Sequence, residues 1–164
     1  MIGQWFTFLF GAVLTFQQER SVFLREQANK LYKPFAYFVA KNAPEVLAST
    51  ITPIIQLIIV YWGVGYNKAA GADGGTFFLI YLVLWLVALA AMSVGLLISA
   101  AAPNFQTATA IAPAVAMPIV LFGGLFVNTD SLPAWLSWIQ YISPVRYGNE
   151  ALAHTQFDEA YYPE

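Results

Sequence analysis

The longest apolar stretch of the chain runs from Gly74 to Thr129 and contains no charged residue. As a single helix rising about 1.5 Å per residue it would be roughly 84 Å long, against a hydrocarbon core of about 30 Å in a bilayer. A proline and two amide side chains interrupt it within residues 102–107. The pattern therefore predicts a membrane hairpin, with spans over residues 77–101 and 108–127 joined by a cytoplasmic turn.

The first residues form a shorter apolar and aromatic segment, residues 2–16. A complete crossing needs about 20 residues, so this segment is short for a span. A signal peptide is disfavoured, because no basic region precedes the apolar residues and no small-residue cleavage site precedes Gln17. We therefore expect residues 2–16 to be a truncated span.

Residues 17–45 carry most of the positive charge. Five of the seven Lys and Arg residues lie here, and by the positive-inside rule they predict a cytoplasmic loop. Within it, residues 21–31 have the pattern of a short amphipathic helix, and Glu26 precedes Lys30 by four residues, a favourable spacing on a helix. Two interpretations remain open: a helix that lies on the membrane surface, and a helix that docks onto a cytoplasmic partner.

A further span is predicted over residues 46–65, followed by an exoplasmic turn over residues 66–76. Asn42 and Pro44 are typical of a helix start, since Asn caps helices and Pro is tolerated in the first turn. Pro53 lies inside the span among hydroxyl and amide side chains, so we expect this face to be turned towards protein. Ordinary helix packing and a transport role both fit this feature.

The last third of the chain is predicted to be less regular. In the span over residues 108–127, two prolines and the pair Gly123-Gly124 indicate a distorted, tightly packed helix. Residues 128–164 are predicted to form an exoplasmic loop with short helices, one of which carries Trp and Tyr residues typical of the headgroup interface. That helix is too short to span, so we expect it to lie in the interface or to re-enter the bundle.

Composition supports a membrane protein. Hydrophobic residues make up 59% of the chain and charged residues 10%, whereas soluble domains carry about 25% charged residues. A soluble fold is disfavoured, because so small a domain lacks the polar surface to surround a pair of apolar helices. The predicted fold class is an all-α, polytopic membrane protein of about four spans plus an interfacial or re-entrant exoplasmic helix.

Residues that carry chemistry are sparse. The net charge of −2 gives no indication of a nucleic-acid partner. The chain has no cysteine, no phosphate-binding loop and no helical His-Glu-x-x-His motif, and its single histidine, His154, has no ligand partner nearby. No charged residue lies inside a predicted span, which disfavours a proton pump, while Arg146 and Glu150 have the spacing of a helical ion pair. The residues thus predict neither an enzyme nor a metal site.

Several short stretches of the sequence are weak signals one by one, but their joint order and spacing are specific. They are residues 19–26, 37–41 and 44–45 with Pro53, followed by residues 60–62, 95–100, 121–128, 132–135 and 141–152. In that order they resemble the transmembrane domain of G-subfamily, White-like ABC half-transporters, which have a type-2 ABC exporter fold. The resemblance covers nearly the whole chain.

The resemblance implies a coupling role for the charged segment. Residues 19–32 would correspond to the coupling helix that presses against the ATP-binding domain in this family. Glu19, Arg25 and Glu26 would then be the charged contacts to that domain and to the connecting helix ahead of the first span.

The resemblance also implies a path for substrate. The second and fifth spans of such transporters line a central cavity at the two-fold axis, and a bulky apolar pair closes its exit. The cavity residues implied here are Gln4, Phe8, Pro113 and Met117. The exit plug would be Leu125 and Phe126, and the helices after Asn128 would form the exoplasmic cap.

Parts of the family's architecture have no counterpart in this sequence. An ATP-binding domain, a connecting helix and a first span precede the matching region in the family, and a sixth span follows it. We therefore expect a truncated domain that begins within the second span. We expect no cofactor in this chain, with ATP and Mg bound by the missing nucleotide-binding domain.

The implied function is ATP-driven export of lipids, sterols or other amphipathic small molecules. The expected partners are the bilayer, the nucleotide-binding domain, a second half-transporter in a homo- or heterodimer, and the substrate, in the plasma membrane or an organelle membrane. The rival hypothesis is a non-transporting scaffold or dominant-negative fragment that pairs with an intact half-transporter. A small channel is disfavoured, since no ring of charges is present. An apolar cavity discriminates weakly between substrates, so the residues do not select one.

Overall fold

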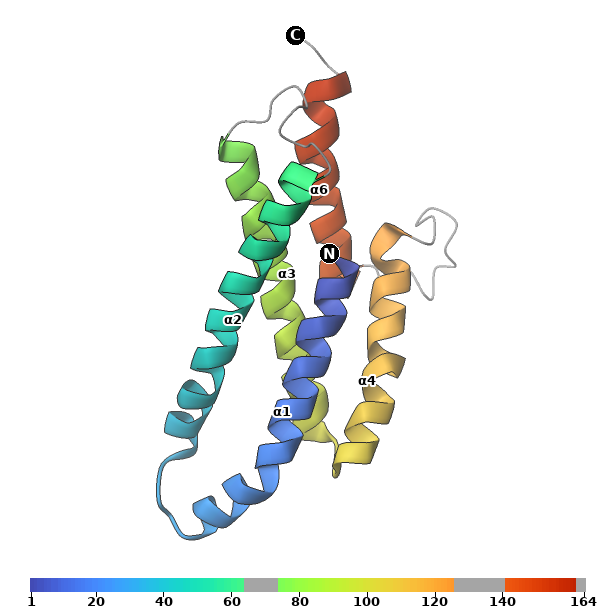
Figure 1. Cartoon of the computed structure of the whole chain (residues 1–164). Helices are drawn as coiled ribbons and strands as arrows, with labels where there is room; N and C mark the ends of the chain where they lie inside the picture. The colour runs from blue at the N-terminus through green and yellow to red at the C-terminus, as the bar shows by residue number, and fades with distance from the viewer. Residues whose placement is uncertain (64–73, 126–140, 162–164) are drawn as a thin grey trace.

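The computed structural model describes residues 1–63, 74–125 and 141–161, with the backbone alone for residues 124–125 and 154–161 (Figure 1). These residues are helical apart from short turns, and none of them lies in a strand, so the predicted all-α fold is confirmed within these ranges. The elements in chain order are α1 (Ile2–Ala28), α2 (Pro34–Gly63), α3 (Gly74–Ala101), α4 (Phe105–Val120), the π-helix η2 (Leu121–Leu125) and α6 (Pro144–Tyr161).

The first four helices run up and down beside one another. The turn that joins α1 to α2 and the turn that joins α3 to α4 lie at the same end of the bundle (Figure 1). Three segments are long and apolar enough to cross a membrane: Pro34–Gly63, Gly74–Ala101 and Phe105–Gly123. α1 does not qualify, because its apolar part, residues 2–16, is too short. The prediction of a multi-pass membrane protein is confirmed.

The most extensive helix contact among the described elements joins α1 to α3. Leu9, Val13 and Gln17 are spaced four residues apart on one face of α1, and all three are buried. Gly95 of α3 lies against the carbonyl group of Leu9, where an added Cβ would overlap the carbonyl oxygen. One turn later, the Ser99 hydroxyl donates a 3.2 Å hydrogen bond to the Val13 carbonyl oxygen. These five residues are called the α1–α3 seam below.

The seam continues to the last carbonyl groups of α3. Gln17 Nε2 donates to the Ser99 carbonyl at 2.6 Å and to the Ala102 carbonyl at 3.3 Å, and the Arg20 guanidinium also donates to the Ala102 carbonyl. The last carbonyl groups of a helix have no partner within it, and a cation beside them is favoured by the helix dipole. α1 therefore holds both the middle and the end of α3.

The structure differs from the predicted segmentation at the end of α1. Residues 21–31 do not form a separate helix, because α1 continues from Ile2 to Ala28 without a break. Its charged part is rich in Gln, Glu and Arg, which are good helix formers, and contains neither Gly nor Pro. The change from apolar to charged residues therefore occurs within one helix and does not mark the end of that helix.

The predicted start of the next helix is also wrong. α2 begins at Pro34, in the first turn of a helix where proline is tolerated, and Pro44 lies inside it. Asn42 does not cap: its side-chain amide donates to the carbonyl of Phe38 within the helix at 2.7 Å. Only residues 29–33 separate α1 from α2.

The predicted polar face of α2 around Pro53 is turned towards protein only in part: Ser49 and Thr50 lie on the packed side, whereas Thr52 and Gln56 are exposed. Pro53 is fully buried, and the Thr50 hydroxyl accepts a hydrogen bond from the Trp85 indole of α3 at 3.2 Å. The Tyr81 hydroxyl, also from α3, donates to the Thr50 carbonyl at 3.3 Å. These hydrogen bonds fix the position of α2 along the axis of α3.

The predicted turn and distortion of the second half of the hairpin are confirmed. Asn104 caps α4 by accepting a 2.8 Å hydrogen bond from the Thr107 backbone amide. The helix then loosens into the π-turn η2 three residues after Pro118, whose missing N–H disturbs the helical ladder. Gly123 in this turn leaves room for the side chain of Val145 of α6, because a Cβ at position 123 would lie only 2.9 Å from Val145 Cγ1.

We expect Gly95→Ala to weaken the seam. The new methyl group has no room between α1 and α3, and overpacking of this kind costs about 1–3 kcal/mol. The matched control is Gly11→Ala in α1, where an added Cβ meets nothing within 4 Å and helix propensity improves. Thermal unfolding of the purified protein followed by tryptophan fluorescence measures both. Equal unfolding temperatures for the two variants would contradict the close approach at Gly95.

Candidate functional site

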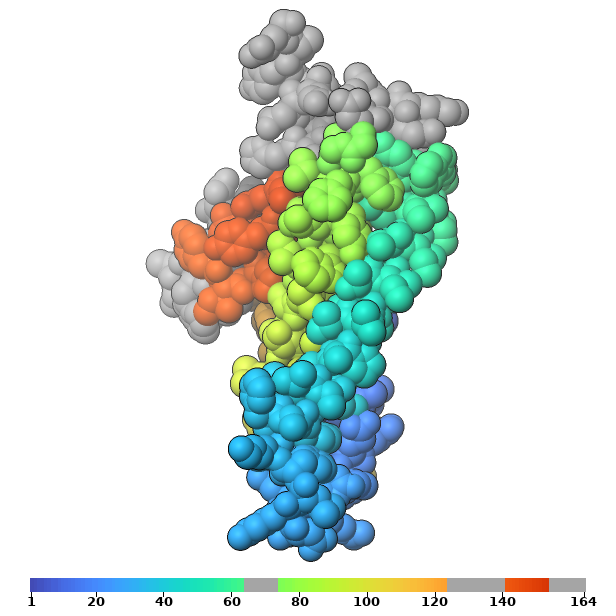
Figure 2. Space-filling view, turned by 90° about the vertical axis from the view of Figure 1, so that its left-hand side faces the viewer, coloured from blue at the N-terminus to red at the C-terminus, as the bar shows by residue number. Residues whose placement is uncertain are grey.

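The charged end of the bundle is formed by the last turns of α1, residues 29–33 and the first turns of α2. We call this segment, residues 15–45, the elbow. It projects beyond the α3–α4 turn in Figure 1, and in Figure 2 the lower tip of the molecule has only the blue shades of the end of α1, residues 29–33 and the start of α2. A partner that meets this end of the bundle therefore meets the elbow first.

A backbone motif ends α1 at the elbow. The Lys30 N–H donates to the Gln27 carbonyl at 2.9 Å, and the Leu31 N–H donates to the Glu26 carbonyl at 3.3 Å. This pair of bonds is the Schellman arrangement, in which the residue after the cap adopts a left-handed conformation. Lys30 does so with a φ of 54°. Such a conformation is costly for a residue with a side chain, so the surrounding contacts hold the turn in place.

Three aromatic rings pack across the elbow. The ring centroids of Phe23 and Tyr37 lie 4.3 Å apart, and those of Tyr32 and Tyr37 lie 5.9 Å apart in a stacked arrangement. The Tyr32 hydroxyl donates a 2.6 Å hydrogen bond to Glu26 Oε2. This bond to a carboxylate is the main reason that the pKa of Tyr32 rises to about 12. The aromatic cluster joins the end of α1 to the start of α2.

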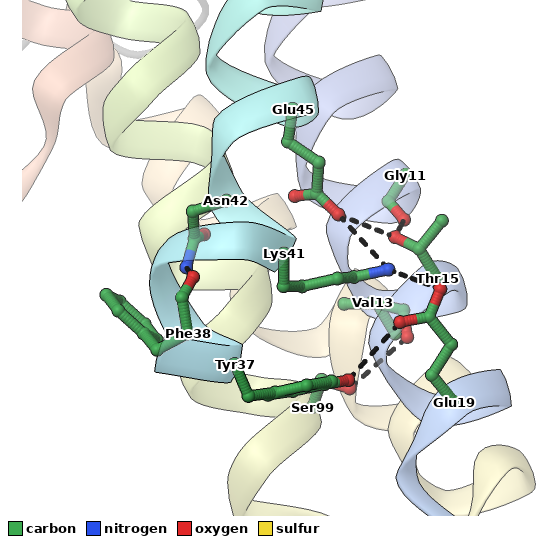
Figure 3. A network of polar contacts seen from close by, with 10 residues as sticks. All are labelled: Gly11, Val13, Thr15, Glu19, Tyr37, Phe38, Lys41, Asn42, Glu45 and Ser99. Carbon is green, nitrogen blue, oxygen red and sulfur yellow. Dashed lines mark hydrogen bonds and ion pairs between the residues drawn. The ribbon is translucent and has the colours of Figure 1, made fainter. Parts of the chain in front are cut away.

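Above the rings, an ion network links the two helices (Figure 3). Lys41 Nζ of α2 lies 2.7 Å from Glu19 Oε1 of α1 and 3.9 Å from Glu45 Oε1 of its own helix. The Tyr37 hydroxyl donates to Glu19 Oε2 at 3.2 Å, and the Thr15 hydroxyl donates to Glu45 Oε1 at 3.1 Å. These five side chains are called the elbow network.

Burial makes the elbow network more than a surface ion pair. The Lys41 side chain is 12% exposed and the Glu45 side chain 19%, while Glu19 is 50% exposed. A mostly buried ammonium group needs its carboxylate partners, since an unpaired charge in such a place is strongly unfavourable. The network therefore holds α2 against α1 at the elbow.

The three predicted coupling residues all lie in the elbow, in different situations. The carboxylates of Glu19 and Glu26 are bound within the chain, to Lys41 and to Tyr32 respectively. Arg25 is exposed on the last turn of α1. Glu19 and Glu26 thus shape the elbow, whereas the side chain of Arg25 is presented outward.

The four predicted cavity residues lie in different environments. Gln4 is buried and lines a cavity with residues of α2, α3 and α6. Phe8 is half-buried beside the main apolar core, Pro113 is half-buried on α4, and Met117 is 52% exposed on the same helix. Of the predicted exit plug, Leu125 belongs to η2 by its backbone, while its side chain and Phe126 lie outside the described residues.

The elbow network was missed at the level of the sequence. Tyr37, Lys41 and Glu45 are spaced four residues apart, which places them on one face of a helix. Thr15 and Glu19 have the same spacing on α1. Two facing polar stripes would have been recognisable if residues 34–45 had been interpreted as helix rather than loop.

We expect Lys41→Met to destabilise the fold by about 1–3 kcal/mol, because it leaves the Glu19 and Glu45 carboxylates close together without a counter-ion. Lys33→Met, which removes an exposed lysine between the helices, should change stability by less than about 0.5 kcal/mol. Thermal unfolding of both variants is the measurement. A Lys41→Met protein as stable as Lys33→Met would show that the network contributes nothing.

We expect Glu26→Gln to bring the pKa of Tyr32 down from about 12 towards its ordinary value of 10.0. Because the pKa is raised in the folded state, the hydrogen bond contributes to stability below pH 10.0 and the contribution is lost as the pH rises through about 12. Carbon-13 NMR of tyrosine-labelled protein reports the titration, with Tyr32→Phe for assignment. An unchanged midpoint would mean that Glu26 is not the cause.

Comparison of the sequence with known proteins identifies the family of this chain. The family model described as ABC-2 type transporter matches residues 1–157. ABC transporter G family member 1 of Dictyostelium discoideum is 30% identical over 162 residues, which are 99% of this chain and 20% of that protein. Protein white of Drosophila melanogaster is 34% identical over 149 residues, 91% of this chain and 21% of that protein.

A mammalian relative gives the same result. The broad substrate specificity ATP-binding cassette transporter ABCG2 of Rattus norvegicus is 34% identical over 148 residues, 90% of this chain and 22% of that protein. The chain spans about a fifth of the length of these curated relatives. With nearly its whole length matched and three helices able to cross a membrane, it belongs to the ABC-2 type transporter family, as part of a transmembrane domain of the G-family, White-like group.

Proposed function

We propose that this chain is the membrane-spanning part of an ATP-driven exporter of lipids, sterols or other amphipathic small molecules. A nucleotide-binding domain outside this chain would bind ATP and Mg and supply the hydrolysis. Relatives whose names combine both activities support this assignment, such as the ATP-binding protein/permease wht-1 of Caenorhabditis elegans, 33% identical over 153 residues. The observation that carries the proposal is the projecting elbow, whose two helices are joined by the elbow network.

The elbow is suited to transmit a movement of a cytoplasmic domain to the membrane-spanning helices. Its tip carries exposed positive side chains, including Arg25 and Lys33, and the positive-inside rule places such residues in the cytoplasm. Beneath the tip, the aromatic cluster and the elbow network lock α1 to α2. The α1–α3 seam then joins α1 to the hairpin, so that a push at the tip tilts the helices together instead of folding the elbow.

The proposed substrate path follows the faces of α1 and α4. Gln4 and Phe8 from α1, with Pro113 and Met117 from α4, are assigned to the central cavity, and Leu125 and Phe126 to its exit. Supporting this, α4 and the start of η2 keep apolar side chains exposed at Ile111, Met117 and Leu121. Such a face suits an apolar substrate or the second half-transporter of a homo- or heterodimer.

The test uses the transporter that contains this chain. We expect Glu26→Ala to reduce transport several-fold while cell-surface abundance stays nearly unchanged, because the Tyr32 hydroxyl loses the carboxylate that fixes the tip of the elbow. The matched control, Gln27→Ala, changes the neighbouring exposed side chain and should transport normally. Transport is measured as efflux of a fluorescent amphipathic dye, and abundance by surface biotinylation.

Two outcomes would count against the proposal. Normal efflux in Glu26→Ala would remove the elbow from the coupling path. Co-purification of the chain with an intact half-transporter, with no efflux dependent on the chain, would favour the non-transporting scaffold.

A further inference from the structure

A groove of about 510 Å³ lies at the elbow, between the second half of α1, the start of α2 and the end of α3. Its volume is in the range of ligand pockets, which run from about 300 to 1,000 Å³. Most of the side chains that line it are apolar, among them Phe16, Phe23, Phe38, Leu96 and Ala100. We call it the elbow groove.

The elbow groove lies at the cytoplasmic border of the membrane. Leu96 and Ala100 belong to the last two turns of α3, which is one of the membrane-crossing helices, and Ala100 is exposed. On the other side of the groove, Phe35 and Phe38 of α2 are 76% and 58% exposed. Because the positive-inside rule places the elbow in the cytoplasm, the groove meets the headgroups and upper acyl chains of the cytoplasmic leaflet.

Asn42, which lines the elbow groove, has one hydrogen-bonding atom without a partner. Its Nδ2 donates to the Phe38 carbonyl at 2.7 Å (Figure 3), and this bond fixes the orientation of the amide, since only the nitrogen can donate. Asn42 Oδ1 is buried and accepts no hydrogen bond from the described residues. A buried acceptor without a donor is costly, so this oxygen points to a ligand that carries an N–H or O–H group.

The charges beside Asn42 favour a cation. Lys41 alone is charged among the described side chains that line the groove. Its ammonium group is bound by two carboxylates, those of Glu19 and Glu45, so the elbow network has a surplus of one negative charge. The groove is also lined by aromatic rings, which attract a cation to their faces.

We propose that the elbow groove binds a phosphatidylethanolamine molecule of the cytoplasmic leaflet. The primary ammonium group donates a hydrogen bond to Asn42 Oδ1, and the upper part of an acyl chain packs against Phe16, Leu96 and Ala100. Phosphatidylcholine has the same charges but no N–H group, so it leaves Asn42 Oδ1 without a donor. A headgroup with hydroxyl groups and a net negative charge would add to the negative surplus of the elbow network.

This site is separate from the substrate path assigned under the proposed function. None of the six residues assigned to that path is among the described residues that line the groove. The lipid is a resident of the fold that joins the start of α2 to the end of α3, and it is not exported. The proposal therefore does not rest on export, and binding is measured without ATP.

The experiment uses the purified full chain in phosphatidylcholine nanodiscs and four photoreactive phospholipids with identical acyl chains. Their headgroups are ethanolamine, N-methylethanolamine, N,N-dimethylethanolamine and choline. All four carry one positive charge, but only the first three carry an N–H group. We expect these three to label peptides at the elbow groove about tenfold more strongly than the choline lipid, and unlabelled phosphatidylethanolamine to compete.

Asn42→Leu removes the acceptor at nearly unchanged volume. It should lower labelling by the three N–H lipids to the level of the choline lipid. The matched control is Gln18→Leu, at an exposed amide of α1 that does not line the groove, and it should keep the wild-type preference.

Three results would overturn the proposal: equal labelling by the ethanolamine and choline lipids, a steady fall with each added methyl group, and an undiminished preference in Asn42→Leu. The first would mean that the groove holds only bulk lipid. The second would mean that headgroup size, not N–H donation, decides binding. The third would assign the preference to another site.

Thermal unfolding separates loss of binding from loss of the fold. In phosphatidylcholine, Asn42→Leu should unfold at or above the wild-type temperature, because an unpartnered oxygen is removed and leucine favours the helix. Phosphatidylethanolamine should raise the unfolding temperature of the wild type and of Gln18→Leu, but not that of Asn42→Leu. An equal rise in all three proteins would contradict a bond to Asn42.

A second variant tests the groove while Asn42 stays in place. Ala100→Trp adds a large side chain on the α3 wall and should exclude the lipid, with labelling by the ethanolamine lipid reduced to that by the choline lipid. Labelling of Ala100→Trp with the wild-type preference would place the lipid elsewhere and overturn the assignment.

Discussion

The close contact of α1 with α3 holds the bundle together. Gly95 allows the two backbones to approach until the Leu9 carbonyl meets the α carbon region of α3, and Ser99 and Gln17 add hydrogen bonds on the same face. In a bilayer the hydrophobic effect contributes little to helix association, so small residues and interhelical hydrogen bonds carry it. Because this seam is fixed, α2, α4 and α6 are positioned by their contacts with α1 or α3.

The α1–α3 seam also supports the elbow. α1 leaves the seam near Gln17 and continues as an unbroken helix to Ala28, so the charged tip stands on a rigid support. α2 returns beside it and is held by Lys41. The opposite half of the bundle is apolar and contains the cavity beside Gln4. One end of the bundle is thus charged and projects, whereas the opposite half is lined by apolar side chains.

The sequence predicted the features that depend on local chemistry. The hairpin turn followed from Pro103 and Asn104, and the distorted end of α4 from its prolines and glycines. The predicted ion pair of Arg146 with Glu150 is present at 2.7 Å. The continuity of α1 and the start of α2 at Pro34 were missed, because charge was interpreted as loop. The partners of Lys41 and the unpartnered oxygen of Asn42 follow from helix packing, which one-dimensional spacing does not contain.

If the elbow network transmits the work of ATP hydrolysis through Lys41, as proposed, the coupling ratio depends on this residue. The coupling ratio is the number of substrate molecules exported per ATP hydrolysed, measured in proteoliposomes of the transporter that contains this chain. For Lys41→Met we predict a ratio reduced several-fold with ATP hydrolysis largely retained, and for Lys33→Met the wild-type ratio. An unchanged ratio in Lys41→Met would contradict a mechanical role for the elbow network.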